Sequence, residues 1–292
     1  MNDRRNKIAG ALYGVAIGDA LGAPLEFMSA EQIRQKHGYV TEMIGGGWLN
    51  VAPGETTDDT AMTLAVAEGI LENPDDPIAA IGERFIVWVR SGPKDIGGTC
   101  SQSIYKAAAM STEKRPSEEQ WFNAAKDTAR ANRGRSGGNG ALMRTIYPGL
   151  YYSNRLMAVK IAAAIAQMTH WDKKSTEACE LYTSMIYLLT EAVYNSDEYR
   201  EDCVYQTLRG TQYEPDPDAT ISPGTQPKPS GYVVDSMKCA VAAFCTTETF
   251  EKAVVIAANM GGDTDTIAAI TGGLAGAYFG YEAIPERWIR EL

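Results

Sequence analysis

The chain has 292 residues, 45% of them hydrophobic, which is enough for a sizeable core in one large domain or two ordinary ones. Lysine and arginine number 27 against 37 acidic residues, for a net charge of −10, and the absence of a basic cluster argues against nucleic acid as the main partner. The five cysteines are odd in number and contain no C-x-x-C pair, so they favour a reduced, cytoplasmic location.

The first segment, residues 1–23, combines a basic start with an apolar run, as a secretory signal does. Asp19 interrupts that run, and no small-residue cleavage site precedes it, so we expect this segment to belong to the folded protein. No stretch reaches the roughly 18 unbroken apolar residues that a membrane span needs. The sequence therefore predicts no transmembrane segment.

Helical spacing of apolar residues dominates the chain. Apolar residues recur every three or four positions in 181–192 and 233–244, and alternating strand patterns are nearly absent. Segments 60–72 and 266–279 are apolar on almost every side, which is typical of central helices surrounded by others. The pattern predicts an all-α domain.

Residues 211–230 interrupt this helical pattern with five prolines and few apolar groups. So long an irregular stretch is typical of a mobile loop or lid, and a plain spacer is the alternative.

Two short stretches rich in aspartate and threonine precede apolar helical segments, "TTDDT" at 56–60 and "GGDTDT" at 261–266. One such side chain suffices to cap a helix, whereas neighbouring carboxylates repel each other unless a cation lies between them. Oxygen ligands favour magnesium or manganese, with calcium as a further option, and no histidine or cysteine lies near for zinc. From the residues alone, a shared metal site and two elaborate helix caps both stay open.

An ordered set of blocks along nearly the whole chain resembles the ADP-ribosylglycohydrolase family, and in particular its bacterial branch typified by dinitrogen-reductase-activating glycohydrolase. The blocks are "GALYGVAIGDALGAPLEF" (10–27), "TTDDT" (56–60), "SGPKDIGGT" (91–99), "GGNGALMR" (137–144), "THWD" (169–172) and "GGDTDT" (261–266).

The resemblance implies one all-α domain over 1–292, a compact multi-helix orthogonal bundle with a central metal site. It implies a hydrolase that removes ADP-ribose from ADP-ribosylated protein by cleaving the N-glycosidic bond to arginine, with dinitrogenase reductase as a candidate target. It also implies two divalent metal ions, manganese or magnesium. Their ligands would be Thr57, Asp58, Asp59, Asp263, Asp265 and Thr266.

The resemblance further implies that Asp95 and Glu26 are acidic residues on the substrate side of the site. We expect them to be the catalytic carboxylates, with Asp95 as acid/base and Glu26 positioning the water or the ribose. The residues implied to bind ADP-ribose are Ser136, Gly137, Gly138, Asn139, Gly140, Met143 and His170. By themselves these signals are weaker. A turn aspartate, a solvated loop glutamate, a plain glycine turn and a core histidine would give the same sequence.

Two other classes of function stay open. The family also includes non-enzymatic relatives, so an ADP-ribose-binding or structural protein is one rival, which the retained set of metal ligands disfavours. The other is a hydrolase of a different bond: an ADP-ribosyl linkage to serine, nucleic acid or a small molecule, or a phosphoester.

Overall fold

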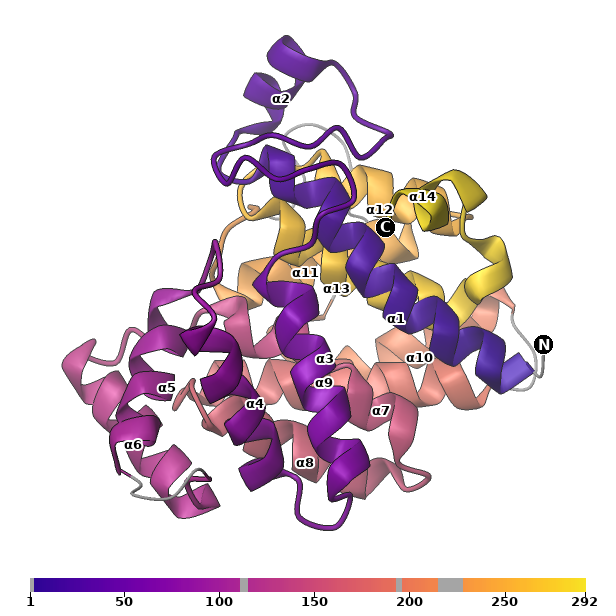
Figure 1. Cartoon of the computed structure of the whole chain (residues 1–292). Helices are drawn as coiled ribbons and strands as arrows, with labels where there is room; N and C mark the ends of the chain where they lie inside the picture. Colours follow the sequence, from indigo (N-terminus) through magenta and orange to yellow (C-terminus); the bar gives the residue numbers. More distant parts are fainter. Residues whose placement is uncertain (1–2, 111–114, 193–195, 215–227) are drawn as a thin grey trace. The chain divides into compact units, whose positions relative to one another are not determined.

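A computed structural model describes residues 3–110, 115–192, 196–214 and 228–292 (Figure 1). Within these ranges the regular structure is helical, and the only β-type pairings are isolated bridges between Ser29 and Gly261 and between Gly46 and Val51. The all-α prediction is thus confirmed for the described part of the chain. The expectation of a loop, lid or spacer at 211–230 falls mostly on 215–227, outside the described residues.

The chain divides into two compact units. The first comprises Met1–Asp59 and Met185–Leu292, and the second comprises Thr60–Ser184. Helices α3 (Asp58–Glu72) and α9 (Lys173–Glu191) each run from one unit into the other. The single domain expected over 1–292 stays a prediction.

The first unit is organised around α13 (Thr264–Phe279), in which every residue from 264 to 278 is buried. Three α-helices make most of its contacts, and Figure 1 shows one of them, α1, in indigo. They are α1 (Asp3–Gly22), α11 (Val233–Cys245) and α12 (Phe250–Ala258). The remaining helices of this unit are η1 (Ala23–Leu25), α2 (Ala30–His37), α10 (Asp197–Leu208), η3 (Tyr281–Ala283) and α14 (Glu286–Glu291). The central helix expected at 266–279 is confirmed.

Helices α1 and α13 pack backbone against backbone. Glycines recur at every fourth position of α1, at 10, 14, 18 and 22, and so share one helix face. A Cβ atom on Gly14 would lie 2.0 Å from the backbone oxygen of Gly272, and one on Gly18 would lie 2.0 Å from that of Ala268. No side chain fits in this contact, which explains why only glycine occupies this face of α1.

Residues Asp3–Leu25 form the one described helical stretch that is long and apolar enough to cross a membrane, with a mean hydropathy of 1.4. Of its most apolar window, 72% is buried inside the protein. The core helix of a globular protein meets the same criteria, so this stretch is weak evidence for a membrane span.

The second unit has its own hydrophobic core, in which the rings of Phe85 and Trp121 meet edge to face at 6.4 Å. Two of its helices begin at side-chain caps: Ser117 forms a capping box with Gln120 at the start of α6, and Asn154 accepts a hydrogen bond from the backbone of Met157 at the start of α8. The helices of this unit are α4 (Ile78–Arg90), α5 (Gly98–Met110), α6 (Glu118–Ala131), η2 (Asn139–Arg144), α7 (Tyr147–Tyr151) and α8 (Arg155–Gln167).

The glycines at 137 and 138 precede a six-residue 3-10 helix, η2, which is followed by the short α7. One local expectation differs from the structure. Helix α3 is not enclosed on all sides, because it buries a stripe of Met62, Val66 and Ile70 and leaves Leu64 and Leu71 more than half exposed. Apolar residues beyond the stripe made 60–72 look more central than it is.

The close contact of α1 and α13 predicts that Gly18→Ala is strongly destabilising. Its methyl group would collide with the backbone of Ala268, so the helices must separate, at a cost of about 3 kcal/mol or more. Urea unfolding of the full chain measures this cost. Gly98→Ala, at a position where a Cβ meets nothing within 4 Å, is the control and should be neutral. Equal stability of the two variants would contradict the packing described.

Candidate active site

The start of α13 is set by a glycine turn. Gly261 and Gly262 both have positive φ, 85° and 74°, a conformation that other residues rarely adopt. The backbone of Gly262 donates to Met28 at 2.8 Å and accepts from Phe27 at 2.7 Å. These two bonds hold the segment after η1 against the beginning of α13, and with it Glu26.

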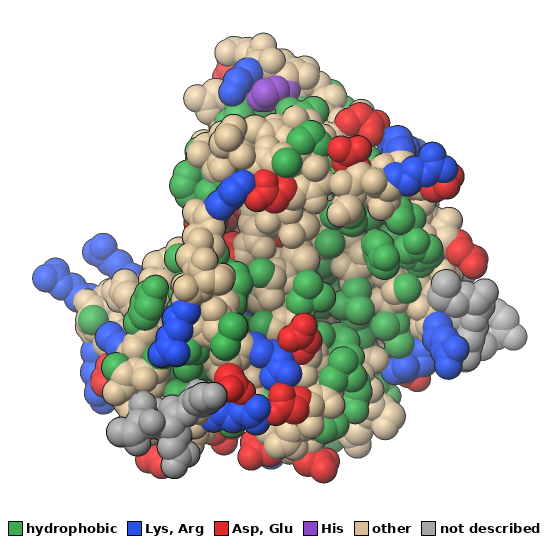
Figure 2. Space-filling model, viewed as in Figure 1, with side chains coloured by type: hydrophobic (Ala, Val, Ile, Leu, Met, Phe, Trp, Pro, Cys, Tyr) green, Lys and Arg blue, Asp and Glu red, His purple; other side chains and the backbone are tan. Residues whose placement is uncertain are grey.

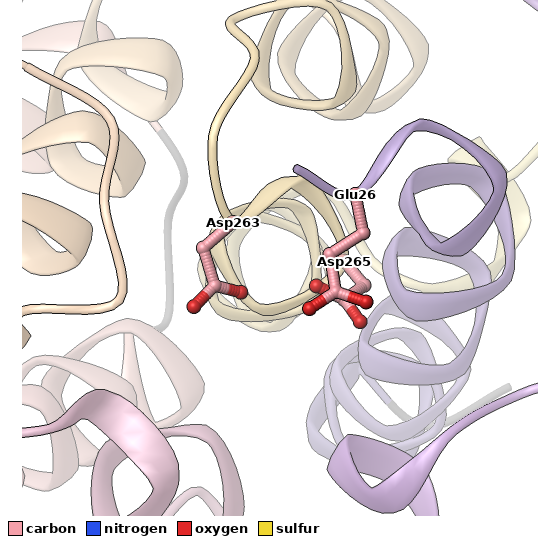
Figure 3. Close-up of side chains that lie close together, drawn as sticks. All are labelled: Glu26, Asp263 and Asp265. Atoms are coloured by element: carbon pink, nitrogen blue, oxygen red, sulfur yellow. The ribbon is translucent and has the colours of Figure 1, made fainter. Parts of the chain in front are cut away.

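Three carboxylates meet at this point. One oxygen from each of Glu26, Asp263 and Asp265 lies within 4.8 Å of the other two, and Figure 3 shows Glu26 and Asp265 directed to the same place. Glu26 and Asp265 are buried, and Asp263 is half-buried. Glu26, implied by the resemblance to act on the substrate side, therefore lies among the aspartates implied to be metal ligands.

The two acidic stretches lie against each other within the first unit. Thr266 Oγ1 donates to Asp59 Oδ2 at 3.2 Å, which joins the start of α13 to the start of α3. Burial, followed by the charges of neighbouring carboxylates, raises the pKa of Asp59 and of Asp265 well above the usual range. For Asp59 these neighbours are Asp19, Asp58 and Asp263.

Asp19 is a member of this site that we did not predict. It is fully buried, and its carboxylate accepts hydrogen bonds from the backbone N–H of Thr57, at 2.9 and 3.0 Å, and from Thr57 Oγ1 at 2.9 Å. It therefore fixes the residue that precedes Asp58 and Asp59. Its signal in the sequence is a lone carboxylate within an apolar helical run.

The residues present fit a hard divalent cation. Asp59 Oδ1 is buried and has no hydrogen-bond partner among the described residues, and a buried polar atom without a partner is costly. A cation would satisfy this oxygen and relieve the repulsion that raises the pKa of Asp59 and Asp265. The donors are carboxylate and hydroxyl oxygens, as magnesium, manganese and calcium prefer.

The other predicted site residues belong to the second unit. Asp95 is half-buried in the connection between α4 and α5. Ser136, Asn139, Met143 and His170 are buried, while the glycines at 137, 138 and 140 are half-buried. Ser136 Oγ lacks a hydrogen-bond partner within the described ranges.

A buried arginine joins the glycine segment to the histidine block of the second unit. Arg144, fully buried at the end of η2, donates to the backbone oxygen of Gly140 at 2.8 Å and to Thr169 Oγ1 at 2.6 Å. Thr169 Oγ1 lies in turn 2.8 Å from His170 Nδ1. Burial, together with the charge of Arg144, lowers the pKa of His170 to about 3, so its ring is neutral near pH 7.

The predicted residues thus divide between the units. The first unit holds Glu26 with Thr57, Asp58, Asp59, Asp263, Asp265 and Thr266, and the second holds Asp95 with the residues expected to bind ADP-ribose. The structure brings residues together within each of these two sets.

The helical fold and the buried group of oxygen donors define an all-α protein with an acidic centre suited to divalent cations. Comparison with known proteins then gives its family. A model described as ADP-ribosylglycohydrolase matches residues 1–292, and the chain belongs to the ADP-ribosylglycohydrolase family.

Curated relatives and a solved structure agree with this assignment. The chain is 32% identical to an ADP-ribosyl-[dinitrogen reductase] glycohydrolase of Rhodospirillum rubrum, over 98% of this chain and 90% of the relative. It is 30% identical to the ADP-ribosylarginine hydrolase Tri1 of Serratia proteamaculans (strain 568), over 98% and 75%. A solved structure titled "ADP-ribosylglycohydrolase-related protein complex" has a TM-score of 0.77 at 28% identity, covering 100% of this chain and 94% of its own.

The unpartnered oxygen of Asp59 predicts that Asp59→Asn changes the stability of the protein differently with and without metal. Without metal, the variant is at least as stable as wild type, because it removes one charge from a crowded group. With manganese at a hundred times its dissociation constant, wild type gains about 2.7 kcal/mol and the variant much less. Thermal unfolding with manganese or with a chelator measures both effects, and Asp127→Asn, at a partly exposed position of α6 in the second unit, is the control. Equal stabilisation of wild type and variant by manganese would exclude Asp59 as a ligand.

The low pKa of His170 predicts a specific dependence of stability on pH. The pKa of His170 is about 3 in the folded protein and 6.5 in the unfolded chain. Its contribution to the free energy of unfolding is therefore fully present above pH 6.5 and is lost progressively as the pH falls toward 3. Between pH 6.5 and 5, wild type should lose on the order of 1–2 kcal/mol more than His170→Gln. Urea unfolding across this range tests the difference, with His37→Gln, at the exposed histidine, as the control expected to follow wild type. If the free energies of unfolding of wild type and His170→Gln changed in parallel with pH, the prediction would be wrong.

Proposed function

We propose that this protein is a metal-dependent hydrolase that removes ADP-ribose from ADP-ribosylated protein by cleaving the N-glycosidic bond to arginine. The observation that carries the proposal is the buried group of oxygen donors around Glu26, Asp59, Asp263 and Asp265. By their names, the Rhodospirillum relative acts on ADP-ribosylated dinitrogen reductase and the Serratia relative on ADP-ribosylarginine, which favours arginine as the linkage here.

Cleavage of a glycosidic bond requires stabilisation of an oxocarbenium-like state, an activated water and a proton for the leaving group. We assign two divalent ions, manganese or magnesium, to the residues of the acidic stretches. When bound, such ions supply Lewis acidity toward the ribose hydroxyls and the attacking water. The ligands are Thr57, Asp58, Asp59, Asp263, Asp265 and Thr266, held in register by Asp19 and by the hydrogen bond from Thr266 to Asp59.

The remaining steps fall to this chain's own side chains. Asp95 donates a proton to the departing guanidine and takes one from the water, and Glu26 orients the ribose or the water. The segment Ser136–Gly140, together with Met143, holds the diphosphate and ribose. His170 lies beside the nucleotide as a neutral ring, because burial and Arg144 keep it unprotonated near pH 7.

We place the protein in the cytoplasm, where thiols stay reduced. All five cysteines lie within the described residues, and none is bonded to another.

The proposal predicts that purified protein with manganese releases ADP-ribose from arginine-linked substrate and loses this activity on chelation. Asp95→Asn should keep its affinity for ADP-ribose while kcat falls about 10²- to 10⁴-fold, because only proton transfer is removed. Product analysis by chromatography and calorimetric binding of ADP-ribose measure the two quantities.

Each alternative function gives its own result in this assay. Equal loss of binding and turnover in Asp95→Asn would assign that residue to substrate binding. Release from serine- or DNA-linked substrate alone would change the linkage. Inorganic phosphate or a mononucleotide as product would indicate a phosphoesterase, and binding of ADP-ribose without any turnover by wild type would indicate a non-catalytic relative.

A further inference from the structure

A groove of about 700 Å³ adjoins the acidic group within the first unit. It is lined by residues of 24–28, by the exposed side of α2 and by Gly47 and Trp48, and one of its lining residues is Glu26. We call it the Glu26 groove. Glu26 also belongs to the group with Asp263 and Asp265, so the groove and the acidic group share this residue.

An exposed aromatic pair forms one wall of the Glu26 groove. Trp48 Nε1 donates to Glu26 Oε2 at 2.6 Å, and the ring of Trp48 lies 5.4 Å from that of Phe27. Phe27 is 68% exposed and Trp48 is 53% exposed. Large aromatic rings on a surface are typical of sites that bind another protein.

Phe27 is held in a strained conformation. Its φ is 64°, which is unfavourable for a bulky side chain and costs on the order of 1–3 kcal/mol. Its backbone N–H bonds to Gly262 at 2.7 Å, and the next residue, Met28, accepts from Gly262 at 2.8 Å. At this corner Glu26 lies with the acidic group, and the Phe27 ring, on the next residue, lies in solvent. Strain maintained in this way is a mark of functional surfaces.

The walls of the groove are formed in advance. Ser29 and Gln32 make a capping box at the start of α2. The side chain of Asn259 bonds to both backbone groups of Val40, at 2.9 and 2.7 Å, and so holds the chain after α2. A preformed groove loses little conformational entropy when it binds a partner.

The position of the groove indicates which part of a substrate it binds. The residues predicted to hold ADP-ribose all belong to the second unit, and none of them lines the groove. The groove instead adjoins the carboxylates at which the bond is cleaved. In a protein substrate the leaving group is an arginine within a polypeptide, so this polypeptide must cover surface continuous with those carboxylates.

The charge on α2 indicates the chemistry of that polypeptide. Lys36 lines the groove, is exposed and forms no ion pair within the described part of the chain. Arg34 and His37 lie on the same short helix, and Figure 2 shows basic and histidine side chains where Figure 1 labels α2. In a protein of net charge −10, this edge suits a partner segment that carries carboxylates.

Resting on the function proposed above, we propose that the Glu26 groove binds the target polypeptide beside the modified arginine. The bound segment places an apolar side chain against Phe27 and Trp48 and a carboxylate toward Lys36. The groove thereby distinguishes a protein substrate from free ADP-ribosyl-arginine.

The test compares two substrates of the full-length protein with manganese: free ADP-ribosyl-arginine, and a folded protein ADP-ribosylated on an arginine flanked by acidic residues. Phe27→Asn removes the ring with a residue type that tolerates positive φ, and Lys36→Glu reverses the charge. We expect either change to raise KM for the protein substrate about five- to thirtyfold, the scale of an interface hot spot. Kinetics on the free substrate should change less than twofold. Trp48 stays unchanged, because its indole hydrogen-bonds Glu26.

Tyr13→Ala is the matched control, since Tyr13 is 40% exposed and pairs with Tyr281 in the same unit, away from the groove. It should leave both substrates unaffected. Equal losses on both substrates in Phe27→Asn would assign the groove to ADP-ribose itself and overturn the inference, as would no loss on either. If wild type releases ADP-ribose from neither substrate, the proposed function fails and the inference falls with it.

Discussion

The contact between α1 and α13 is the constraint on which the site depends. Because glycines occupy every fourth position from 10 to 22 of α1, the two backbones come into direct contact over several turns. This fixes Asp19 on α1, Glu26 just beyond it and the aspartates that open α13 relative to one another. The positions of these charged side chains are thus set by the contact of two backbones. A small shift of α1 against α13 would move these carboxylates relative to one another, since close-packed interiors transmit strain.

The acidic group also shows how stability and chemistry oppose each other. Several carboxylates share a buried region in which each raises the pKa of its neighbours, and one oxygen of Asp59 has no partner among the described residues. Such a group lowers the stability of the metal-free fold. Rigid packing of α13, buried along nearly its whole length, offsets this cost. A site built to bind cations is expected to lower the stability of the fold in this way until a cation is bound.

The sequence predicts local features well and tertiary ones poorly. Periodicity identified α11, uniformly apolar composition identified α13, and paired aspartates identified both acidic stretches, because each signal lies within a few residues. The place of Glu26 among the aspartates depends on backbone bonds to Gly262, far along the chain, which no local pattern encodes. Asp19 was missed for the same reason, since its partner Thr57 lies on another segment. The exposed side of α3 shows that apolar content alone does not measure burial.

The segment between Met28 and Thr57 is anchored at both ends to the acidic centre, by the bond from Gly262 to Met28 and by the bonds from Thr57 to Asp19. Within the intervening chain, Trp48 bonds Glu26 directly, so this residue also helps to keep the carboxylates in place. Evolution can rebuild the rest of this stretch, α2 included, without disturbing the carboxylates. Because the carboxylates and the intervening segment are held separately, changes in one surface segment can alter which target is bound while the chemistry at the carboxylates stays the same.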